Sequence, residues 1–240
     1  MMAGRLRDRI LRHSSTSRRN RDVAGHIRPL LKSSETVLDA GCGEVGLAPF
    51  LSPAQVVGVD LGESKCAEAN FLFIRGSITD LPLEDRSVGV AASVDTIEHL
   101  PEGARPAAIR EMVRVARTAV VISFPRGQHA RRVDDDYRRL LKRRNQPEPE
   151  WLAEHLAEPY PEVKSTIGLI ADEARRIGRS VDIEVGYSEW LASARLLRWL
   201  SAYSERLAVA VDLVLGPLVG MVMRPRERQS YRAIVVARFV

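Results

Sequence analysis

The sequence predicts an α/β protein with a mostly parallel, seven-stranded sheet, helices on both faces and a helical insertion before the last strand. Three observations support this fold class. Short apolar runs alternate with helical stretches, which is typical of parallel strands joined by right-handed crossovers. Runs such as residues 88–94 hold no charged residue, as strands buried on both faces require. A glycine-rich turn follows the first run, and a carboxylate ends the second, at the sheet edge where such proteins bind ligands.

The first half of the chain supplies five of these strands. A helix over residues 20–32 leads into the first strand, over residues 36–39. After the glycine-rich turn, Leu47, Phe50 and Leu51 recur at helical spacing and predict a short helix. The other four strands are predicted over residues 56–60, 71–74, 88–94 and 119–123.

The second half is more basic and more helical. Residues 126–144 hold seven arginines and one lysine against three aspartates, and they begin a predicted basic, substrate-side segment over residues 126–180. A helical insertion is predicted over residues 190–222. The elements predicted here are helices over 151–156 and 167–177, a strand over 181–185, a long helix over 190–219 broken at Gly216 and Pro217, and a closing strand over 231–239.

Positive charge is concentrated at the amino end. The 240 residues carry a net charge of +5, yet residues 1–21 alone hold seven arginines against one aspartate. We predict a basic, flexible arm over residues 1–19, followed by a single domain over residues 20–240. The arm is compatible with a solvated tail, a segment that binds nucleic acid or acidic lipid, or a targeting peptide.

The number of cysteines and the lack of a secretory segment indicate the cellular compartment of the protein. Cys42 and Cys66 are too few for a disulfide framework or a zinc site, and no apolar secretory stretch follows the first arginines. A cytoplasmic protein is therefore expected, with membrane association as a further possibility. Residues 207–223 are 17 apolar-rich residues, short of the ~20 that a membrane span needs, so they predict a substrate cover, a dimer contact or a helix lying on a membrane.

The glycine-rich turn predicts a nucleoside site. Gly41 and Gly43 allow the backbone to approach a ligand that a Cβ would exclude, and Asp60 can accept both hydroxyls of a ribose. Gly41, Gly43 and Gly46 also fit the spacing of a dinucleotide fingerprint, so a dehydrogenase is an alternative. Asp39 weighs against it, because a carboxylate there would repel a pyrophosphate. Asp39 instead suits a ligand that carries an ammonium group.

Four segments carry a family resemblance, and they come in the family's order. Residues 39–43 resemble the first motif, D-x-G-x-G, of class I S-adenosylmethionine-dependent methyltransferases. Residues 76–83 are similar to the family's adenine-binding segment, 93–101 to the end of its fourth strand, and 111–125 to the helix and strand that follow. The resemblance covers about residues 35–125 and is to the quinone-biosynthesis-like branch, methyltransferase type 11. It implies a Rossmann-like fold, S-adenosylmethionine as cofactor and methyl transfer as activity.

The resemblance also implies roles for individual residues. His99 is the candidate general base, since an imidazole titrates near neutrality and this one follows the fourth strand. The alternative is that Glu98 and His99 only begin a helix. The implied cofactor-binding residues are Asp39 and Gly41 at the methionine part, Gly43 in the same turn, Asp60 and Leu61 at the ribose, Ser77 and Ile78 at the adenine, and Asp95 and Thr96 beside the sulfonium.

Some residues depart from the family's pattern. Val45, Ser77 and Gly89 stand where the family usually has Gly, Asp and Asp, which keeps a non-catalytic scaffold with the same fold as an alternative. Asp95, Glu98 and His99 resemble the metal cluster of some O-methyltransferases. With only three candidate ligands, and Asp in place of the usual Glu, no metal site is predicted.

The expected function is S-adenosylmethionine-dependent methylation, at oxygen, of a small or lipid- or glycan-linked acceptor. The helical insertion and a similarity to bacterial methyltransferases of surface-glycan or lipid pathways favour this class of acceptor. Peripheral contact with an anionic membrane and a homodimer are compatible with the sequence. The enzyme alternative is an RNA methyltransferase that grips phosphates with its basic segments. An aromatic content of 5% and the lack of a known RNA-binding module argue against nucleic acid as a partner.

Overall fold

The computed structural model describes residues 15–32, 35–204, 206–212 and 225–240. The chain forms two compact units, which we name the sheet unit and the helical unit. The sheet unit comprises residues 20–124, 161–186 and 234–240, and the helical unit comprises 1–19, 125–160 and 187–233, as far as they are described. The region predicted as one domain thus contains two units. The predicted substrate-side segment, 126–180, is shared between them.

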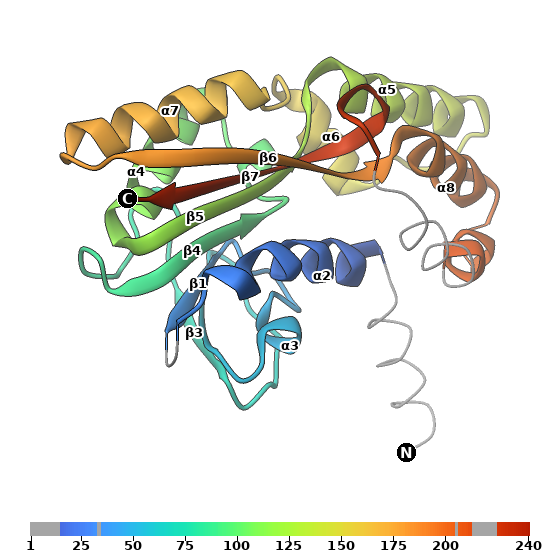
Figure 1. Ribbon diagram of the computed structural model, residues 1–240. Coiled ribbons are helices and arrows are strands. Elements are labelled where there is room, and N and C mark those ends of the chain that lie inside the picture. The colour runs from blue at the N-terminus through green and yellow to red at the C-terminus, as the bar shows by residue number, and fades with distance from the viewer. Residues whose placement is uncertain (1–14, 33–34, 205, 213–224) are drawn as a thin grey trace. The chain divides into compact units, whose positions relative to one another are not determined.

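The seven strands and their order confirm the predicted fold class (Figure 1). The sheet order is β3-β2-β1-β4-β5-β7-β6, and the strand pairs from β3 to β5 are parallel. Figure 1 shows β7 running opposite to its neighbours. The strands are β1 (Thr36–Ala40), β2 (Gln55–Asp60), β3 (Phe71–Arg75), β4 (Val88–Val94), β5 (Ala116–Pro125), β6 (Val181–Trp190) and β7 (Ser230–Phe239).

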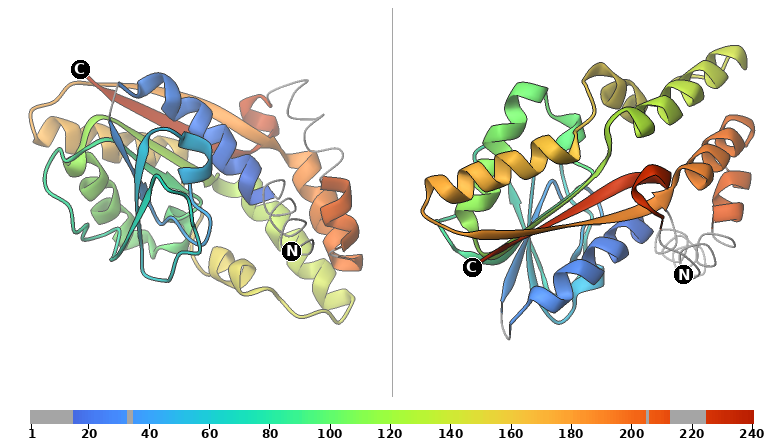
Figure 2. Two further views of the ribbon diagram at one scale, coloured as in Figure 1. Left: turned by 90° about the horizontal axis from the view of Figure 1, so that it is seen from below. Right: turned by 45° about the horizontal axis from the view of Figure 1, so that its top comes forward.

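Helices and short 3-10 turns connect the strands. The α-helices are α2 (Ser15–Ile27), α3 (Ala48–Leu51), α4 (Arg105–Val115), α5 (Gly127–Arg143), α6 (Glu150–Ala157), α7 (Val163–Arg176) and α8 (Leu191–Tyr203). The 3-10 turns are η1 (Arg28–Leu30), η2 (Ile97–His99), η3 (Glu102–Ala104) and η4 (Glu227–Gln229). In the sheet unit, α2 lies on one face of the sheet and α4 and α7 on the other (Figure 2).

Burial on both faces explains the apolar strands of the sheet unit. Six of the seven residues of β4 are buried, and β1 lies between β4 and β2. The register places Asp39 beside Ala92 of β4 and Gly58 of β2, so the carboxyl ends of the three central strands meet at one edge. The core on one face combines valines of these strands with α2 and α3 and includes Val23, Ile27, Val37, Leu47, Leu51, Val56 and Val90.

The helical unit has its own core. It is formed by the apolar faces of α5, α6 and α8 together with Tyr231 of β7. Its buried members include Val133, Tyr137, Leu141, Leu152, Leu156, Tyr160, Ala194 and Ala202. The segment that the sequence predicts only as basic forms the 17-residue helix α5. One side of this helix is apolar and buried, and its arginines lie on the other side.

The region predicted as one long helix over residues 190–219 is helical in most of its described part, but the helix is interrupted at Ser204. Strand β6 continues to Trp190, and α8 ends at Tyr203. Ser204 is extended, and its Oγ accepts a hydrogen bond from the Leu207 N–H (3.3 Å) at the start of a second helical stretch over residues 206–212. A serine that caps a new helix separates two helices where apolar periodicity alone suggests one. The predicted break at Gly216 and Pro217 lies outside the described residues.

Other boundaries differ less. The fifth and sixth strands are longer than predicted because their ends carry polar residues that break the apolar runs, such as Arg117 and Glu189. In the part of the chain that the structure describes, no helix is long and apolar enough to cross a membrane.

Candidate functional site

The turn after β1 depends on glycine at defined positions. Gly41, Gly43 and Gly46 have φ angles of +77°, +55° and +61°, a region that other residues rarely adopt. A Cβ at Gly41 would lie 2.2 Å from Cγ2 of Thr96, so the side chain of Thr96 fills that space. A Cβ at Gly43 would meet nothing within 4 Å. The turn is therefore closed on the side of β4 and open at Gly43, where a ligand can approach the backbone.

Asp39 holds the far end of this turn. Its carboxylate is buried, and Oδ2 accepts a hydrogen bond from the Leu47 N–H (2.7 Å) at the beginning of α3. Burial raises the pKa of Asp39 to about 7, against the Leu47 N–H, which lowers it, and with a further increase from the charge of Asp60. Buried carboxyls with a raised pKa are frequent at ligand sites, and a positively charged ligand group beside Asp39 would stabilise its ionised form.

Asp60 connects the end of β2 to the same turn. Its Oδ2 accepts a hydrogen bond from the Gly43 N–H (2.9 Å) and its Oδ1 one from the Gly62 N–H (2.9 Å). Each carboxylate oxygen can accept more than one hydrogen bond, so both retain capacity for ribose hydroxyls. The neighbouring Leu61 is 68% exposed, an unusual position for a leucine and a suitable one for covering a flat ligand.

Thr96 joins the end of β4 to the glycine turn. Its Oγ1 donates to the Gly41 carbonyl (3.2 Å), while Asp95 has a φ of +51° and donates its N–H to the Ser123 carbonyl (2.9 Å). A left-handed conformation at a residue other than glycine is strained, and such strain is concentrated at functional sites. The predicted residues of β1, β2 and β4 are thus brought to one edge of the sheet.

His99 lies three residues beyond Thr96 and ends η2. Its side chain is exposed, and its N–H donates to the Thr96 carbonyl (3.0 Å). His99 belongs to a short 3-10 turn and its side chain is exposed, and its role as a general base stays a prediction. Within the described residues, Asp95 does not gather with Glu98 and His99 at metal-ligand spacing.

Ser77 and Ile78 lie in the loop that follows β3. Ser77 Oγ contacts Thr79 Oγ1 (2.8 Å) and accepts the Thr79 N–H (3.2 Å), and Ile78 is buried. Ser77 therefore stabilises the turn through its own hydroxyl, at the position where the family usually has aspartate.

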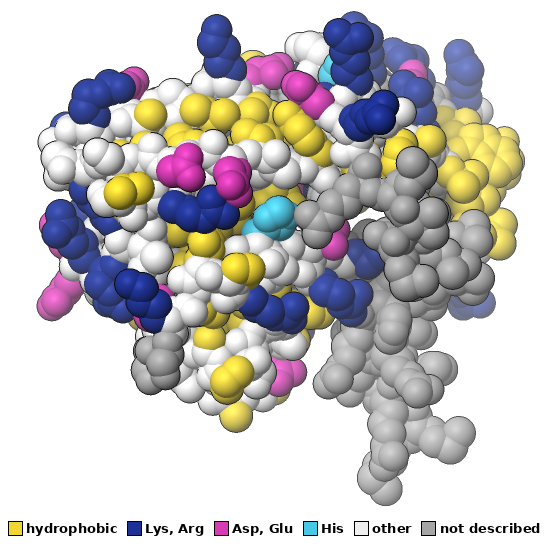
Figure 3. All heavy atoms as spheres, viewed as in Figure 1, with side chains coloured by type: hydrophobic (Ala, Val, Ile, Leu, Met, Phe, Trp, Pro, Cys, Tyr) yellow, Lys and Arg dark blue, Asp and Glu magenta, His cyan; other side chains and the backbone are white. Residues whose placement is uncertain are grey.

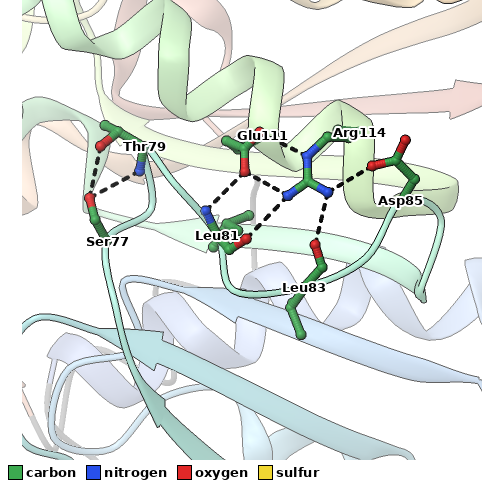
Figure 4. Close-up of polar contacts among 7 residues, drawn as sticks. All are labelled: Ser77, Thr79, Leu81, Leu83, Asp85, Glu111 and Arg114. Atoms are coloured by element: carbon green, nitrogen blue, oxygen red, sulfur yellow. Dashed lines mark hydrogen bonds and ion pairs between the residues drawn. The ribbon is translucent and has the colours of Figure 1, made fainter.

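Two residues of α4 that the sequence analysis missed fix this loop (Figure 4). Arg114 donates to the carbonyls of Leu81 (3.1 Å) and Leu83 (2.8 Å). Arg114 also bonds both carboxylate oxygens of Glu111 (2.8 and 2.7 Å), and Glu111 accepts the Leu81 N–H (2.9 Å). We call Glu111 and Arg114 the loop clamp. Their i, i+3 spacing on a predicted helix was the available signal.

The open backbone at Gly43, the acceptor oxygens of Asp60 and the buried carboxyl of Asp39 are features that would suit a nucleoside carrying a cationic group. A family model described as a methyltransferase domain matches residues 38–124. This part of the chain is similar to class I S-adenosylmethionine-dependent methyltransferases. The match ends at Phe124, the last residue of β5 in the sheet unit, so the predicted family, fold and cofactor are confirmed on this unit.

Individual relatives agree with this family. Proteins of two Mycobacterium tuberculosis strains, described as probable S-adenosylmethionine-dependent methyltransferases, are 35% identical over 117 residues, which is 45% of this chain and 42% of each relative. The chain thus aligns with less than half of the length of these curated relatives. A protein of Aspergillus luteorubrus described as a probable methyltransferase is 25% identical over 220 residues, covering 79% of this chain and 74% of that protein.

Solved structures show the same fold. A crystal structure from Anabaena variabilis, described as a methyltransferase from an antibiotic biosynthesis pathway, has a TM-score of 0.57 at 17% identity and covers 90% of this chain and 98% of its own. A Haemonchus contortus N-methyltransferase in complex with S-adenosylhomocysteine has a TM-score of 0.52 at 17% identity, over 92% of this chain and 52% of that one.

Proposed function

We propose that the protein transfers the methyl group of S-adenosylmethionine to an oxygen atom of a small or lipid- or glycan-linked acceptor. The observation that carries the proposal is the connection of His99, through Thr96, to the glycine turn. Thr96 accepts the His99 N–H at its carbonyl and donates its hydroxyl to Gly41. These two hydrogen bonds connect the backbone of His99 to the turn that would bind the methyl donor, and the side chain of His99 is exposed.

The residues of the turn fit the cofactor. Gly43 leaves space for a ligand, Asp60 keeps acceptor capacity for two hydroxyls, and Asp39 is a buried carboxyl suited to an ammonium group. When bound, the cofactor supplies an electrophilic methyl group on a sulfonium. We assign Asp39, Gly41 and Gly43 to its methionine part, Asp60 and Leu61 to the ribose, and Ser77 and Ile78 to the adenine, with Asp95 and Thr96 beside the sulfonium.

His99 then acts as the general base. The acceptor hydroxyl forms the new C–O bond as the C–S bond breaks, and its proton passes to the imidazole of His99. The products are a methyl ether, S-adenosylhomocysteine and the protonated imidazole. Alignment of the reacting atoms supplies much of the acceleration, and proton removal by a well-placed base typically contributes about 10²–10⁴-fold.

The proposal is tested in two steps. Calorimetric titration with S-adenosylmethionine first establishes binding, and Asp60→Ala is expected to abolish it while the protein remains folded. Methyl transfer is then measured over sugar, lipid and quinone acceptors for the wild type and His99→Gln. A loss of kcat in His99→Gln with unchanged cofactor affinity supports the base. Equal kcat in the two proteins assigns proton removal to another group.

Contacts of the basic segment weaken the RNA methyltransferase alternative. Arg131 donates to the carbonyls of Leu156 and Glu158, and Arg138 pairs with Glu148 (2.6 Å). These arginines hold the helical unit together. Copurifying RNA and a steep loss of binding with salt would restore that alternative.

A further inference from the structure

The helical unit exposes a cluster of large apolar side chains. Nine large hydrophobic residues are exposed in the described part of the chain, and five of them fall between positions 196 and 209. Exposed apolar residues that occur singly are ordinary, whereas a contiguous group marks an interaction surface. The five are Leu196, Trp199, Tyr203, Leu207 and Val209.

Helix α8 separates into a buried and an exposed face. Ala194 and Ala202 belong to the helical core, while Leu196, Trp199 and Tyr203 recur at intervals of three and four residues on the other side. Trp199 and Tyr203 are 50% and 51% exposed, and their ring centroids lie 4.7 Å apart. Figure 3 shows hydrophobic side chains gathered over α8 at the right of the view.

Positive charge accompanies this face. In α8, Arg198 pairs with the buried Asp134 and Arg195 is exposed. At the end of α5, Arg138 and Arg139 pair with Glu148 and Asp136, and the basic residues that follow them are the exposed Lys142, Arg143 and Arg144. Helices α5 and α8 are in contact, and the guanidinium of Arg144 lies 3.7 Å from the centroid of the Tyr203 ring, with its Nε donating to the Ala202 carbonyl (3.0 Å).

We infer that this face docks on the surface of an anionic lipid bilayer. We call it the α8 face and define it by Leu196, Trp199, Tyr203, Arg144 and Arg195. Trp and Tyr favour the boundary between headgroups and acyl chains, and each arginine near an anionic surface adds attraction. A second copy of the chain on this face would place like charges opposite one another, which disfavours a dimer there.

The inference deepens the proposed function and rests on it, since a lipid-linked acceptor would be met at such a surface. Fluorescence provides a direct test, because the chain has three tryptophans. In Trp151→Phe/Trp190→Phe, Trp199 is the single emitter. Vesicles of phosphatidylcholine with phosphatidylserine are expected to shift its emission to the blue, and brominated acyl chains to quench it. Phosphatidylcholine alone is expected to do neither.

Matched variants distinguish vesicle binding through the α8 face from nonspecific adsorption of the protein to vesicles. Trp199→Ser is expected to weaken vesicle binding about tenfold, and Arg195→Gln about fivefold. Leu72→Ser removes an equally exposed leucine from β3, and Lys164→Gln removes an exposed charge from α7. Both controls belong to the sheet unit and are expected to bind vesicles like the wild type.

Several results would overturn the inference. These are no emission shift with folded protein, equal losses in the α8 and control variants, or a dimer in sedimentation that Trp199→Ser dissociates. The last result would assign the face to a second copy. Titration with S-adenosylmethionine is run on the same samples, so that failure of cofactor binding is distinguished from failure of membrane docking.

Discussion

Among the residues that the structure describes, each unit has one aspartate that is almost fully inaccessible to solvent, and the pKa values of the two are shifted in opposite directions. Asp39 of the sheet unit is 1% exposed and Asp134 of the helical unit is 0% exposed. Burial raises the pKa of Asp39 to about 7. Burial also acts to raise the pKa of Asp134, but the charge of Arg198 and several hydrogen bonds outweigh it and lower that pKa to about 2.

The difference lies in the partners. Asp134 accepts hydrogen bonds from the hydroxyls of Tyr160 and Tyr231 (both 2.6 Å) and pairs with Arg198 (2.5 Å). Asp39 contacts a backbone N–H and, within the described residues, no basic side chain. The helical unit neutralises its buried carboxylate with an arginine, and the sheet unit gives its own only a backbone N–H. The proposed function assigns this carboxyl of the sheet unit to the ammonium group of the cofactor.

The largest expected effect is on stability and comes from removing Asp134, the buried carboxylate that is paired with an arginine. Asp134→Ala leaves Arg198 buried without its carboxylate, so the free energy of unfolding is expected to fall by about 3–5 kcal/mol. Urea denaturation measures it. Asp136→Ala, on the same helix, removes an exposed ion pair with Arg139 and is expected to cost less than about 1 kcal/mol. Similar losses in both variants would show that Asp134 is not a structural centre.

The pH dependence of stability separates the two aspartates. A carboxyl whose pKa is raised on folding stabilises the protein below its unfolded pKa, and that stabilisation is lost as pH rises. For Asp39 the free energy of unfolding is expected to decrease from about pH 4 to about pH 7, by up to about 1.4 kcal/mol per pH unit. For Asp134, with its lowered pKa, the contribution is lost only as pH falls toward about 2.

Unfolding measured at pH 5, 6, 7 and 8 checks this sign. Asp39→Asn is expected to remove the decrease, and Asp134→Asn to leave the slope over this range unchanged. An unchanged slope in Asp39→Asn would contradict the raised pKa of Asp39.

The glycine turn is expected to respond next. Gly41→Ala combines a φ of +77° with a clash against Thr96, and it should lower stability by about 1–3 kcal/mol and weaken cofactor binding. Gly25→Ala is the matched control, because Gly25 lies within α2 with nothing within 4 Å of an added Cβ. It should stabilise the protein by about 0.5–1 kcal/mol. A Gly41→Ala protein as stable as the wild type would contradict the conclusion that the side chain of Thr96 leaves no space for a Cβ at Gly41.

The smallest effect concerns the loop clamp. Arg114→Gln is expected to raise KM for S-adenosylmethionine about tenfold while kcat and the acceptor KM stay close to wild type, because Arg114 holds the loop after β3, which the proposed function assigns to the adenine. Arg110→Gln, on the same helix, breaks an ion pair with Glu173 (3.1 Å) and should leave KM unchanged. A fall in kcat at constant KM would place Arg114 in another role.

The sequence predicted the sheet unit better than the helical unit for a physical reason. Its strands are continuous apolar runs, and its site residues follow strand ends that a parallel sheet must bring together. In the helical unit the decisive contacts join distant positions, since Asp134 meets Arg198 and Tyr231 across 64 and 97 residues. The only local signal was an aspartate between Val133 and Tyr137 on the apolar side of α5.

The same difference applies to the candidate cofactor site. The motifs predict Asp39, Gly41, Asp60 and Thr96, and these remain predictions, whereas the loop clamp and the hydroxyl pair of Ser77 depend on side-chain geometry that a motif does not contain. The end of α8 was missed because Ser204 interrupts the helix without a glycine or proline.

The most direct test is calorimetric titration with S-adenosylmethionine of the wild type, Asp60→Ala and Asp134→Asn, each verified as folded. If the sheet unit holds the cofactor at the glycine turn, the wild type and Asp134→Asn bind alike and Asp60→Ala does not bind. Wild-type protein that fails to bind, or binding that survives Asp60→Ala unchanged, would contradict the assignment of the cofactor to this turn.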